Sequence, residues 1–505
     1  MDKTEEIMKK KLSFPTAYSV LYIVLFMAAL LTYFIPAGAY SKLKYEANQG
    51  IFVRVDPDGG EIVLPGTQET LDELGISNEL EKFEDGSINK PVAIPGTYTQ
   101  VESNPQGIKS ILISPVLGVY DSIGIILFVL ILGGVIGVLN HSGAIDTGIE
   151  ALSKVTKGHE FLLIIFITSL IALGGTTFGL EEETIAFYPI LIPVFLAAGY
   201  DVLVCIAAIY LGSSIGKMFS TTNPFSVVIG SNAAGINFTQ GIVVRIIGLV
   251  LGIVITLIYI MYYAKKVQKN PEKSLCYDMK EQIQKRYSRG VKKVEFTIHR
   301  KLTLIVFGLT FVLMIYGVSQ LGWWFEEMTA LFLVSGVLIG ILSRISEKVF
   351  VGAFIAGAAD LVGVGLIIGI ARSINIILEQ GYVSDTILYR LSNVVSGMSP
   401  SVFSILLLFV FLILGFFIAS SSGLATLAIP IMAPLADSVG VPKEVIITAY
   451  LFGQGLISFI TPTGLILASL EMGNLSYNKW LRFVLPLFCM IGLVAIAMLL
   501  VQVYI

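Results

Sequence analysis

The chain has 505 residues, of which 55% are apolar and only 14% charged, and 33 Lys+Arg against 36 Asp+Glu leave a formal net charge of −3. A soluble domain carries about 25% charged residues, and a water-soluble protein of this size could not bury so much apolar surface. Lipid is therefore the solvent for most of the chain, which excludes a soluble enzyme, a nucleic-acid binder and a disordered or fibrous protein.

The first apolar run, residues 16–36, follows three consecutive lysines at 9–11. Its length of about 20 residues suits a membrane span better than the shorter apolar core of a signal peptide, although Ala37-Gly38-Ala39 resembles a cleavage site. We expect a retained first span preceded by a cytoplasmic N-terminal tail, together covering residues 1–40.

Two long polar segments separate the apolar runs and differ in charge. Residues 41–107 hold 12 acidic and 5 basic residues, and Asp58-Gly59 within them predicts the turn of a β-hairpin. Residues 264–301 hold 12 basic and 4 acidic residues. Because basic loops stay in the cytoplasm, we predict a small extracellular β-containing loop at 41–107 and a cytoplasmic loop at 264–301.

The other apolar segments differ in length, and several are too short to span a bilayer alone. Clusters of Gly, Ser, Thr and Pro interrupt some of them. They lie at about 110–140, 161–179, 184–199, 203–219 and 238–262, and, after the basic loop, at 302–319, 328–343, 350–378, 402–419, 424–436, 443–460, 464–473 and 481–504.

The two halves of the chain share a sequence pattern. At an offset of 241 residues, nine of the 34 positions from 189 to 222 are identical, among them Gly212 with Gly453. At an offset of 239, Asp121 matches Asp360. Matching of Pro, Gly and Asp residues distinguishes a true repeat from the general similarity of apolar sequences.

We therefore predict two repeats, at residues 108–263 and 347–505, joined by connecting spans at 302–346. The first repeat begins outside, after the acidic segment, whereas the second begins inside, after the basic loop and two further spans. The copies are then inverted in the membrane. Inverted repeats with polar interruptions near the middle of the bilayer are typical of secondary transporters.

Each repeat contains two polar breaks within apolar sequence. Backbone that leaves the helix inside a bilayer must be buried in protein or line a wet cavity, where oxygens hold cations and helix N-termini hold carboxylates. We interpret the first break of each copy as the tip of a re-entrant hairpin, with an ordinary surface loop as the alternative. The candidate substrate-binding residues of the breaks are Thr177, Glu181, Glu182, Glu183, Thr221, Thr222 and Asn223 in the first copy and Ser420, Ser421, Ser422, Thr461 and Thr463 in the second.

The breaks have charged residues in or beside them. Each of the three glutamates at 181–183 costs at least about 2.5 kcal/mol at mid-membrane unless it is paired. They bind a cationic substrate or a proton at a hairpin tip, or they face water in a surface loop. Lys217 lies just before the second break, where it replaces a coupling cation, pairs with the acidic tip or extends to the membrane interface.

Further polar residues lie in the apolar segments. Arg372 is a candidate to receive a substrate carboxylate through two hydrogen bonds or to neutralise a glutamate. Asp121 and Asp360 begin matching spans, and we expect them to be structural. Asn375 and Gln454 are candidate cavity residues, with packing hydrogen bonds as the alternative.

Several motifs resemble the YfcC family of bacterial carriers over nearly the whole chain. They are Phe14-Pro15-Thr16-Ala17-Tyr18, Ile35-Pro36-Ala37-Gly38, Pro105-Gln106-Gly107, Glu182-Glu183-Thr184, Tyr188-Pro189, Asn223-Pro224-Phe225-Ser226 and Pro430-Ile431-Met432-Ala433-Pro434. That family is related to the C4-dicarboxylate carriers within the ion transporter superfamily. The resemblance implies an all-α polytopic membrane protein in which each of two inverted repeats holds a re-entrant hairpin and a broken helix. It also implies a homodimer and an elevator-like movement of a transport domain.

The chain departs from the family pattern near the expected site. Lys217 stands where the family usually has a small or aromatic residue, and Gln454 stands where it has an aspartate in Gly-Asp-Gly. The second hairpin reads Ser420-Ser421-Ser422-Gly423-Leu424 instead of Ser-Gly-Ser-Gly-Gln. Losing an aspartate and gaining a lysine both reduce cation binding. We therefore predict exchange without Na⁺, with Lys217 in place of the coupling ion.

Members of similar length and layout include arginine/ornithine antiporters of the ArcD type, and the acidic cluster suits a cationic amino acid. The prediction is exchange of arginine for ornithine across the bacterial cytoplasmic membrane. The first alternative is Na⁺- or H⁺-coupled symport of a carboxylate or dicarboxylate. A membrane enzyme, or a scaffold for the 41–107 segment, is the second, although the sequence lacks a catalytic constellation. We expect no cofactor, metal or nucleic acid; the expected partners are substrate, lipid and a second copy of the chain.

Overall fold

The computed structural model describes residues 15–505 except 77, 85–87, 89, 157, 288–296, 322 and 396–397. Within this part the chain is mostly helical and holds eight helices long and apolar enough to cross a membrane, which confirms the polytopic all-α fold. These spans are Ala17–Phe34, Ile123–Ser142, Ile242–Lys269, Ile298–Val318, Phe325–Leu342, Glu347–Gln380, Pro400–Phe417 and Tyr477–Val503.

The two repeats have the same order of elements. The first holds α5 (Ile108–Asp121), α6 (Ile123–Ser142), α7 (Ala144–Thr156), α8 (Phe161–Thr177), η1 (Glu182–Phe187), α9 (Tyr188–Ala197), α10 (Val202–Met218), η2 (Pro224–Val228), α11 (Ile229–Ala233) and α12 (Ile242–Lys269). The second holds α16 (Glu347–Ala359), α17 (Val362–Gln380), α18 (Val383–Val395), α19 (Pro400–Phe417), α20 (Ser421–Val439), α21 (Lys443–Ser458), α22 (Ile466–Met472) and α23 (Tyr477–Val503). Between them lie α14 (Ile298–Leu321) and α15 (Phe325–Leu342).

Helix packing follows the repeat. The first helix of each copy packs against the second helix of the other copy: α5 packs against α17, and α16 packs against α6. Within each copy the hairpin packs on the broken helix, α8 against α10 and α19 against α21. The N-terminal helix α2 (Ala17–Phe34) packs on α17 as an integral span. The copies are therefore interlocked around shared helix pairs.

Two segments expected as single apolar runs are each divided into two helices. The run at 110–140 breaks between α5 and α6 at Ser122, and the run at 350–378 breaks between α16 and α17 at Leu361. The two break residues adopt nearly the same backbone, φ −103° and ψ 14° against φ −107° and ψ 1°. A single aspartate, Asp121 or Asp360, precedes each break, but the long apolar stretches on both sides keep the averaged hydropathy high, so hydropathy alone does not reveal the break.

The polar breaks divide the core helices as predicted. The chain reverses after α8 into η1 and α9, and after α19 into α20, which forms the two hairpins. The second break follows α10 in the first copy and α21 in the second, before the short helices α11 and α22. Every residue of α10 is buried, and α21 is buried from Val445 to Ser458. The two broken helices contact each other at the centre of the molecule.

Glycines allow the hairpins to lie close to the broken helices. A Cβ atom at Gly216 would lie 2.2 Å from the carbonyl oxygen of Ala172 on α8. At the repeat-related glycines the same clash occurs: 2.8 Å from Thr168 O for Gly212 and 2.5 Å from Leu408 O for Gly453. Small residues at such crossings let membrane helices pack backbone to backbone.

Gly216→Ala should therefore lower the stability of the protein in detergent. The added methyl group forces α8 away from α10, and overpacking of this kind costs about 1–3 kcal/mol. Thermal unfolding followed by tryptophan fluorescence measures the shift of the melting temperature. Gly308→Ala in α14 is the matched control, because a Cβ there meets no atom within 4 Å. Equal melting temperatures for the two variants would contradict this packing.

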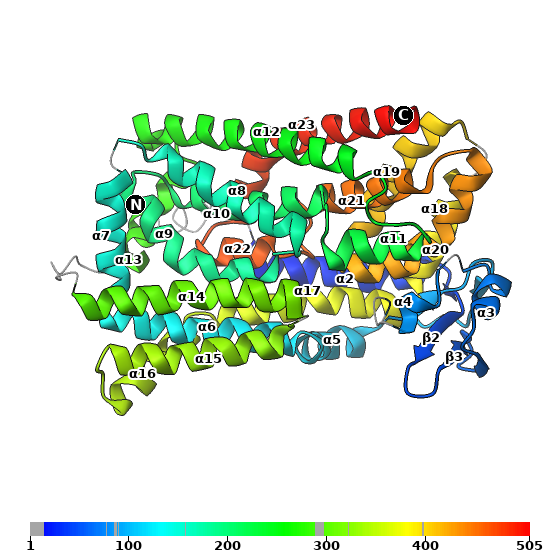
Figure 1. Cartoon of the computed structure of the whole chain (residues 1–505), viewed down its shortest axis with the longest axis horizontal. Helices are drawn as coiled ribbons and strands as arrows, with labels where there is room; N and C mark the ends of the chain where they lie inside the picture. Colours follow the sequence, from blue (N-terminus) through cyan, green and yellow to red (C-terminus); the bar gives the residue numbers. More distant parts are fainter. Residues whose placement is uncertain are drawn as a thin grey trace, which may run out of the picture.

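A small β domain lies at one end of the molecule, as Figure 1 shows. Its four-stranded sheet has the order β4-β3-β2-β5, and β1 pairs separately with β6. The predicted turn is confirmed, since β3 and β4 pair in antiparallel fashion around Asp58-Gly59. Buried Leu43, Phe52 and Val92 give the domain its own core. The elements are β1 (Gly38–Ala39), β2 (Lys42–Glu46), β3 (Ile51–Val55), β4 (Glu61–Pro65), α3 (Gln68–Glu73), α4 (Glu81–Glu84), β5 (Val92–Ala93) and β6 (Thr99–Gln100).

The basic segment lies at the opposite end (Figure 1) and is docked on the helices. It continues α12 through η3 (Pro271–Lys273) and η4 (Tyr277–Met279) into α13 (Lys280–Tyr287). Ser274 Oγ donates to Asp201 Oδ2 at 2.6 Å, and the Tyr287 hydroxyl donates to the Met472 carbonyl. Residues 270–287 thus form a strap across α10 and α22, where the sequence predicts only a polar loop.

Candidate functional site

A cavity of about 600 Å³ lies where the two hairpin tips face α17. Ten of the 14 residues singled out from the sequence line it, and they come from both repeats. The ten are Glu181, Glu182, Glu183, Lys217, Asn223, Arg372, Ser420, Ser421, Ser422 and Thr463. Asn375 also lines the cavity, whereas Gln454 is buried behind it and donates to the Ala419 carbonyl at 3.4 Å.

An ion pair joins the first hairpin to its broken helix. Lys217 Nζ, in the last turn of α10, lies 2.8 Å from Glu181 Oε1 and 2.7 Å from Oε2. Its side chain is 10% exposed and that of Glu181 is 26% exposed. Of the three roles considered for Lys217, the geometry matches pairing with the acidic tip.

The other two glutamates of the tip keep their carboxylates available. Glu183 Oε2 accepts a hydrogen bond from the Glu181 backbone at 3.2 Å. Within the described part of the chain, neither Glu182 nor Glu183 forms an ion pair, and both line the cavity. The tip therefore presents two carboxylates to whatever enters.

A second ion pair joins Arg372 on α17 to Asp121 at the end of α5. The partner of Arg372 is Asp121 and not the glutamate expected from the sequence. The structure also places Asp121, expected to be structural, in the cavity wall. Both side chains are partly exposed, 31% for Arg372 and 46% for Asp121, so solvent screens the pair and a substrate can reach it.

Three candidate threonines do not line the cavity. The backbone N–H groups of Thr221 and Thr222 donate to the Thr176 carbonyl at 3.0 and 3.1 Å, and the Thr177 hydroxyl donates to Leu173 O at 2.6 Å. Thr176, which is not among the candidate residues, also donates through its hydroxyl to Phe219 O at 2.8 Å. The bonds of Thr176 with Thr221, Thr222 and Phe219 fasten the hairpin to the unwound backbone of the broken helix, whereas the Thr177 hydroxyl bonds within α8.

The equivalent break in the second repeat is similar. Thr461 does not line the cavity, but its hydroxyl lies 2.7 Å from that of Thr463, which does. The hairpin residue Ser421 accepts a hydrogen bond through its carbonyl from Tyr450 at 2.9 Å. Ser422 accepts one from Lys90 of the β domain at 2.7 Å. No sequence pattern connects Lys90 to the hairpin, so this contact could not be predicted from the sequence.

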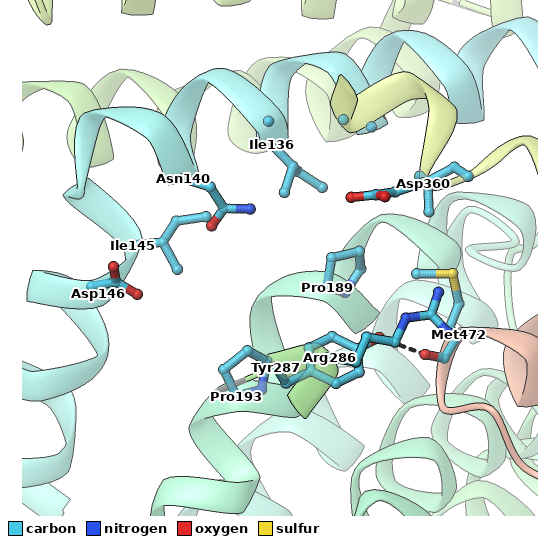
Figure 2. A pocket seen from close by; sticks show the side chains of 14 residues that line it. Ile136, Asn140, Ile145, Asp146, Pro189, Pro193, Arg286, Tyr287, Asp360 and Met472 are labelled. Carbon is cyan, nitrogen blue, oxygen red and sulfur yellow. Dashed lines mark hydrogen bonds between the residues drawn. The ribbon is translucent and has the colours of Figure 1, made fainter. Parts of the chain in front are cut away.

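A smaller cavity of about 190 Å³ lies on the side of α13. Figure 2 shows Asn140 and Asp360 pointing toward one space from neighbouring helices, with Tyr287 of α13 bonded to Met472 on its far side. Asp360 is the repeat partner of Asp121, which lines the larger cavity. The inverted repeat thus places one member of this aspartate pair in each cavity.

Comparison with known families now identifies the chain. The family model described as DcuC, C4-dicarboxylate anaerobic carrier, matches residues 14–504. The chain belongs to the DcuC family. It is therefore a multi-pass membrane transporter that acts on a small-molecule substrate, and the resemblance to the carriers drawn from its motifs is confirmed at that level.

Two relatives of this DcuC family member cover most of its length. A protein of Haemophilus influenzae, described as uncharacterized, is 47% identical over 498 residues, 98% of each chain. The putative basic amino acid antiporter YfcC of Escherichia coli is 33% identical over 373 residues, which is 72% of this chain and 74% of YfcC.

Two solved transporter structures align with nearly the whole chain at low similarity. Neisseria gonorrhoeae MtrF, described as illuminating a class of antimetabolite efflux pumps, is 18% identical, with a TM-score of 0.38 over 99% of this chain and 97% of its own. Alcanivorax borkumensis YdaH is 12% identical, with a TM-score of 0.37 over 96% of this chain and 98% of its own.

Proposed function

We propose that this DcuC family member exchanges basic amino acids, arginine for ornithine, across the bacterial cytoplasmic membrane. The observation that carries the proposal is the charge of the cavity wall. Five carboxylates line it, from Asp121, Glu181, Glu182, Glu183 and Glu326, and three cations, from Lys90, Lys217 and Arg372. The excess of carboxylates favours a cationic substrate, and the relationship to the putative basic amino acid antiporter YfcC supports the same class.

The same charges give a reason for exchange. An empty cavity with two glutamates lacking an ion pair resists movement through the membrane, because each uncompensated charge there costs several kcal/mol. A bound arginine or ornithine supplies the missing positive charge and relieves that cost. The Lys217 ammonium already neutralises Glu181, so no Na⁺ is required at that position.

The arrangement of helices supports an elevator-type movement. The hairpins and broken helices form one packed group, α8 with α10 and α19 with α21, and the cavity separates their tips from α17. In the proposal this group moves against the remaining helices of a homodimer. The N-terminus and the basic strap face the cytoplasm, and the β domain faces outward.

Uptake of labelled arginine by proteoliposomes tests the proposal. The vesicles are preloaded with ornithine, arginine or buffer alone, with and without gradients of Na⁺ and of pH. We expect uptake only into vesicles that contain a basic amino acid, at a rate independent of Na⁺. Uptake into buffer-loaded vesicles driven by an ion gradient would show a symporter and refute obligatory exchange.

The alternative is coupled uptake of a carboxylate or dicarboxylate. The description of the DcuC family favours it, as do Arg372 and Lys90, which place two cations in the cavity wall. Competition distinguishes the two functions: excess unlabelled succinate leaves labelled arginine uptake unchanged in an amino acid exchanger. If labelled succinate is taken up and arginine is not, the carboxylate function holds.

A further inference from the structure

Lys90 lies in the β domain, but its side chain lines the transport cavity. It precedes β5 by two residues, and β5 is held in place by pairing with β2, Leu43 opposite Val92 and Lys42 opposite Ala93. The same strand packs against α20, the helix that begins at the second hairpin tip. The sheet therefore fixes Lys90 over that tip.

The Lys90 ammonium touches the hairpin directly. Its Nζ donates to Ser422 Oγ at 2.7 Å, and Ser422 Oγ lies 3.4 Å from the Ser420 hydroxyl. Among the residues that the structure describes, no carboxylate forms an ion pair with Lys90. The other two cations of the wall each have one, Glu181 for Lys217 and Asp121 for Arg372.

The environment of Lys90 favours the arrival of a negative charge. Lys90 is exposed at the mouth, but partial desolvation of its ammonium, and then the positive charge of Arg372, lower its pKa more than the carboxylates of Asp121 and Glu379 raise it. A carboxylate placed beside the ammonium offsets both effects. The wall is also polarised, because Glu182 and Glu183 lie on the first hairpin whereas Lys90 reaches the tip of the second. An amino acid with a cationic side chain presents opposite charges at its two ends in the same way.

We propose that Lys90 makes the β domain part of the transport site. In the empty protein it closes the outer mouth of the cavity by holding Ser422, and on entry of substrate it transfers this hydrogen bond to the substrate carboxylate. The carboxylate assignment rests on the proposed function, because it takes the ligand to be an amino acid. Closure of the mouth does not depend on the identity of the ligand, so two measurements separate the two parts.

Closure is tested without any substrate. Gly464 lines the cavity, and in vesicles the Gly464→Cys variant is labelled from outside by a membrane-impermeant maleimide. Labelling of the protein without this substitution is subtracted. We expect Lys90→Ala to speed labelling at least threefold. Lys44→Ala is the control, because Lys44 is exposed on β2 and pairs with Glu46 at 2.6 Å. If the cysteine is labelled at the same rate in protein that retains Lys90 and in the Lys90→Ala variant, Lys90 does not close the mouth.

Carboxylate recognition is tested with arginine and agmatine, which share the guanidinium but differ in the carboxylate. Each competes from outside against uptake of labelled arginine. We expect Lys90→Ala to raise the half-inhibitory concentration of arginine about tenfold, as for loss of a hydrogen bond to a charged group, and to change that of agmatine less than twofold. Lys90→Arg keeps the positive charge, so its half-inhibitory concentration of arginine should lie between those of the unmodified protein and of Lys90→Ala.

The outcomes distinguish this inference from the proposed function. Equal effects on arginine and agmatine, or no effect on either, would show that Lys90 does not receive the carboxylate even though exchange is intact. If the unmodified protein does not transport arginine at all, the proposed function fails, and the maleimide rates still decide whether Lys90 closes the mouth.

Discussion

Lys217→Ala should lower arginine exchange about 100-fold or more, the largest effect that we expect from a single substitution. The ammonium contacts both carboxylate oxygens of Glu181, and both side chains are less than a third exposed. Removing one partner of a largely buried pair leaves an uncompensated charge and costs about 3–5 kcal/mol. Since about 1.4 kcal/mol corresponds to a factor of ten, the expected loss is at least 100-fold. Initial rates of arginine/ornithine exchange in proteoliposomes measure it.

The double variant Lys217→Ala/Glu181→Gln removes both charges and separates lost function from lost folding. We expect it to recover part of the exchange, because the carboxylate that Lys217→Ala leaves without a partner at position 181 is then absent. The residual exchange of Lys217→Ala alone should become stimulated by Na⁺, since the cation can occupy the place of the ammonium. Full exchange by Lys217→Ala, independent of Na⁺, would mean that Lys217 does not substitute for a coupling ion.

The Lys217–Glu181 ion pair could be predicted from the sequence, because both charged residues lie in apolar surroundings beside polar breaks. Few partners exist there, so pairing was one of a small set of options. The ion pair between Arg372 and Asp121 could not be predicted, although the sequence marks both residues as charges in apolar segments. They are 251 positions apart, and nothing in the sequence shows that the break at Ser122 places Asp121 in the cavity wall beside Arg372.

The architecture was more predictable than the contacts. Matched proline, glycine and aspartate residues revealed the inverted repeat because each marks a backbone feature that both copies need. In contrast, Lys90 is an ordinary charged residue in a polar segment, and only the pairing of β5 with β2 carries it to the hairpin. Thr176 was not chosen as a candidate, because the sequence does not show which threonine of the Thr176-Thr177 pair is the buried hydrogen-bonding residue.

Glu182→Gln and Glu183→Gln should each raise the concentration of external arginine needed for half-maximal exchange at least tenfold. Lys217 already forms an ion pair with Glu181. The carboxylates of Glu182 and Glu183 on the first hairpin are therefore available to the cationic end of the substrate. A hydrogen bond to a charged group contributes about 1.5–3 kcal/mol, which corresponds to roughly 10- to 100-fold in affinity. Glutamine keeps the size of the side chain and removes only the charge, which limits effects on folding.

The change in half-saturation separates binding by these glutamates from a role in the movement alone. Loss of a binding contact raises the half-saturating concentration, whereas a residue that acts only in the movement lowers the maximal rate and leaves that concentration unchanged. Glu272→Gln on the strap is the matched control, because Glu272 is exposed far from the cavity wall and should not affect either quantity. The double variant Glu182→Gln/Glu183→Gln removes the excess negative charge of the wall, leaving three carboxylates against three cations. If the proposed function is correct, it loses arginine exchange. If it instead keeps transport and succinate begins to compete, the substrate is a carboxylate, and Arg372 and Lys90 are the residues that bind it.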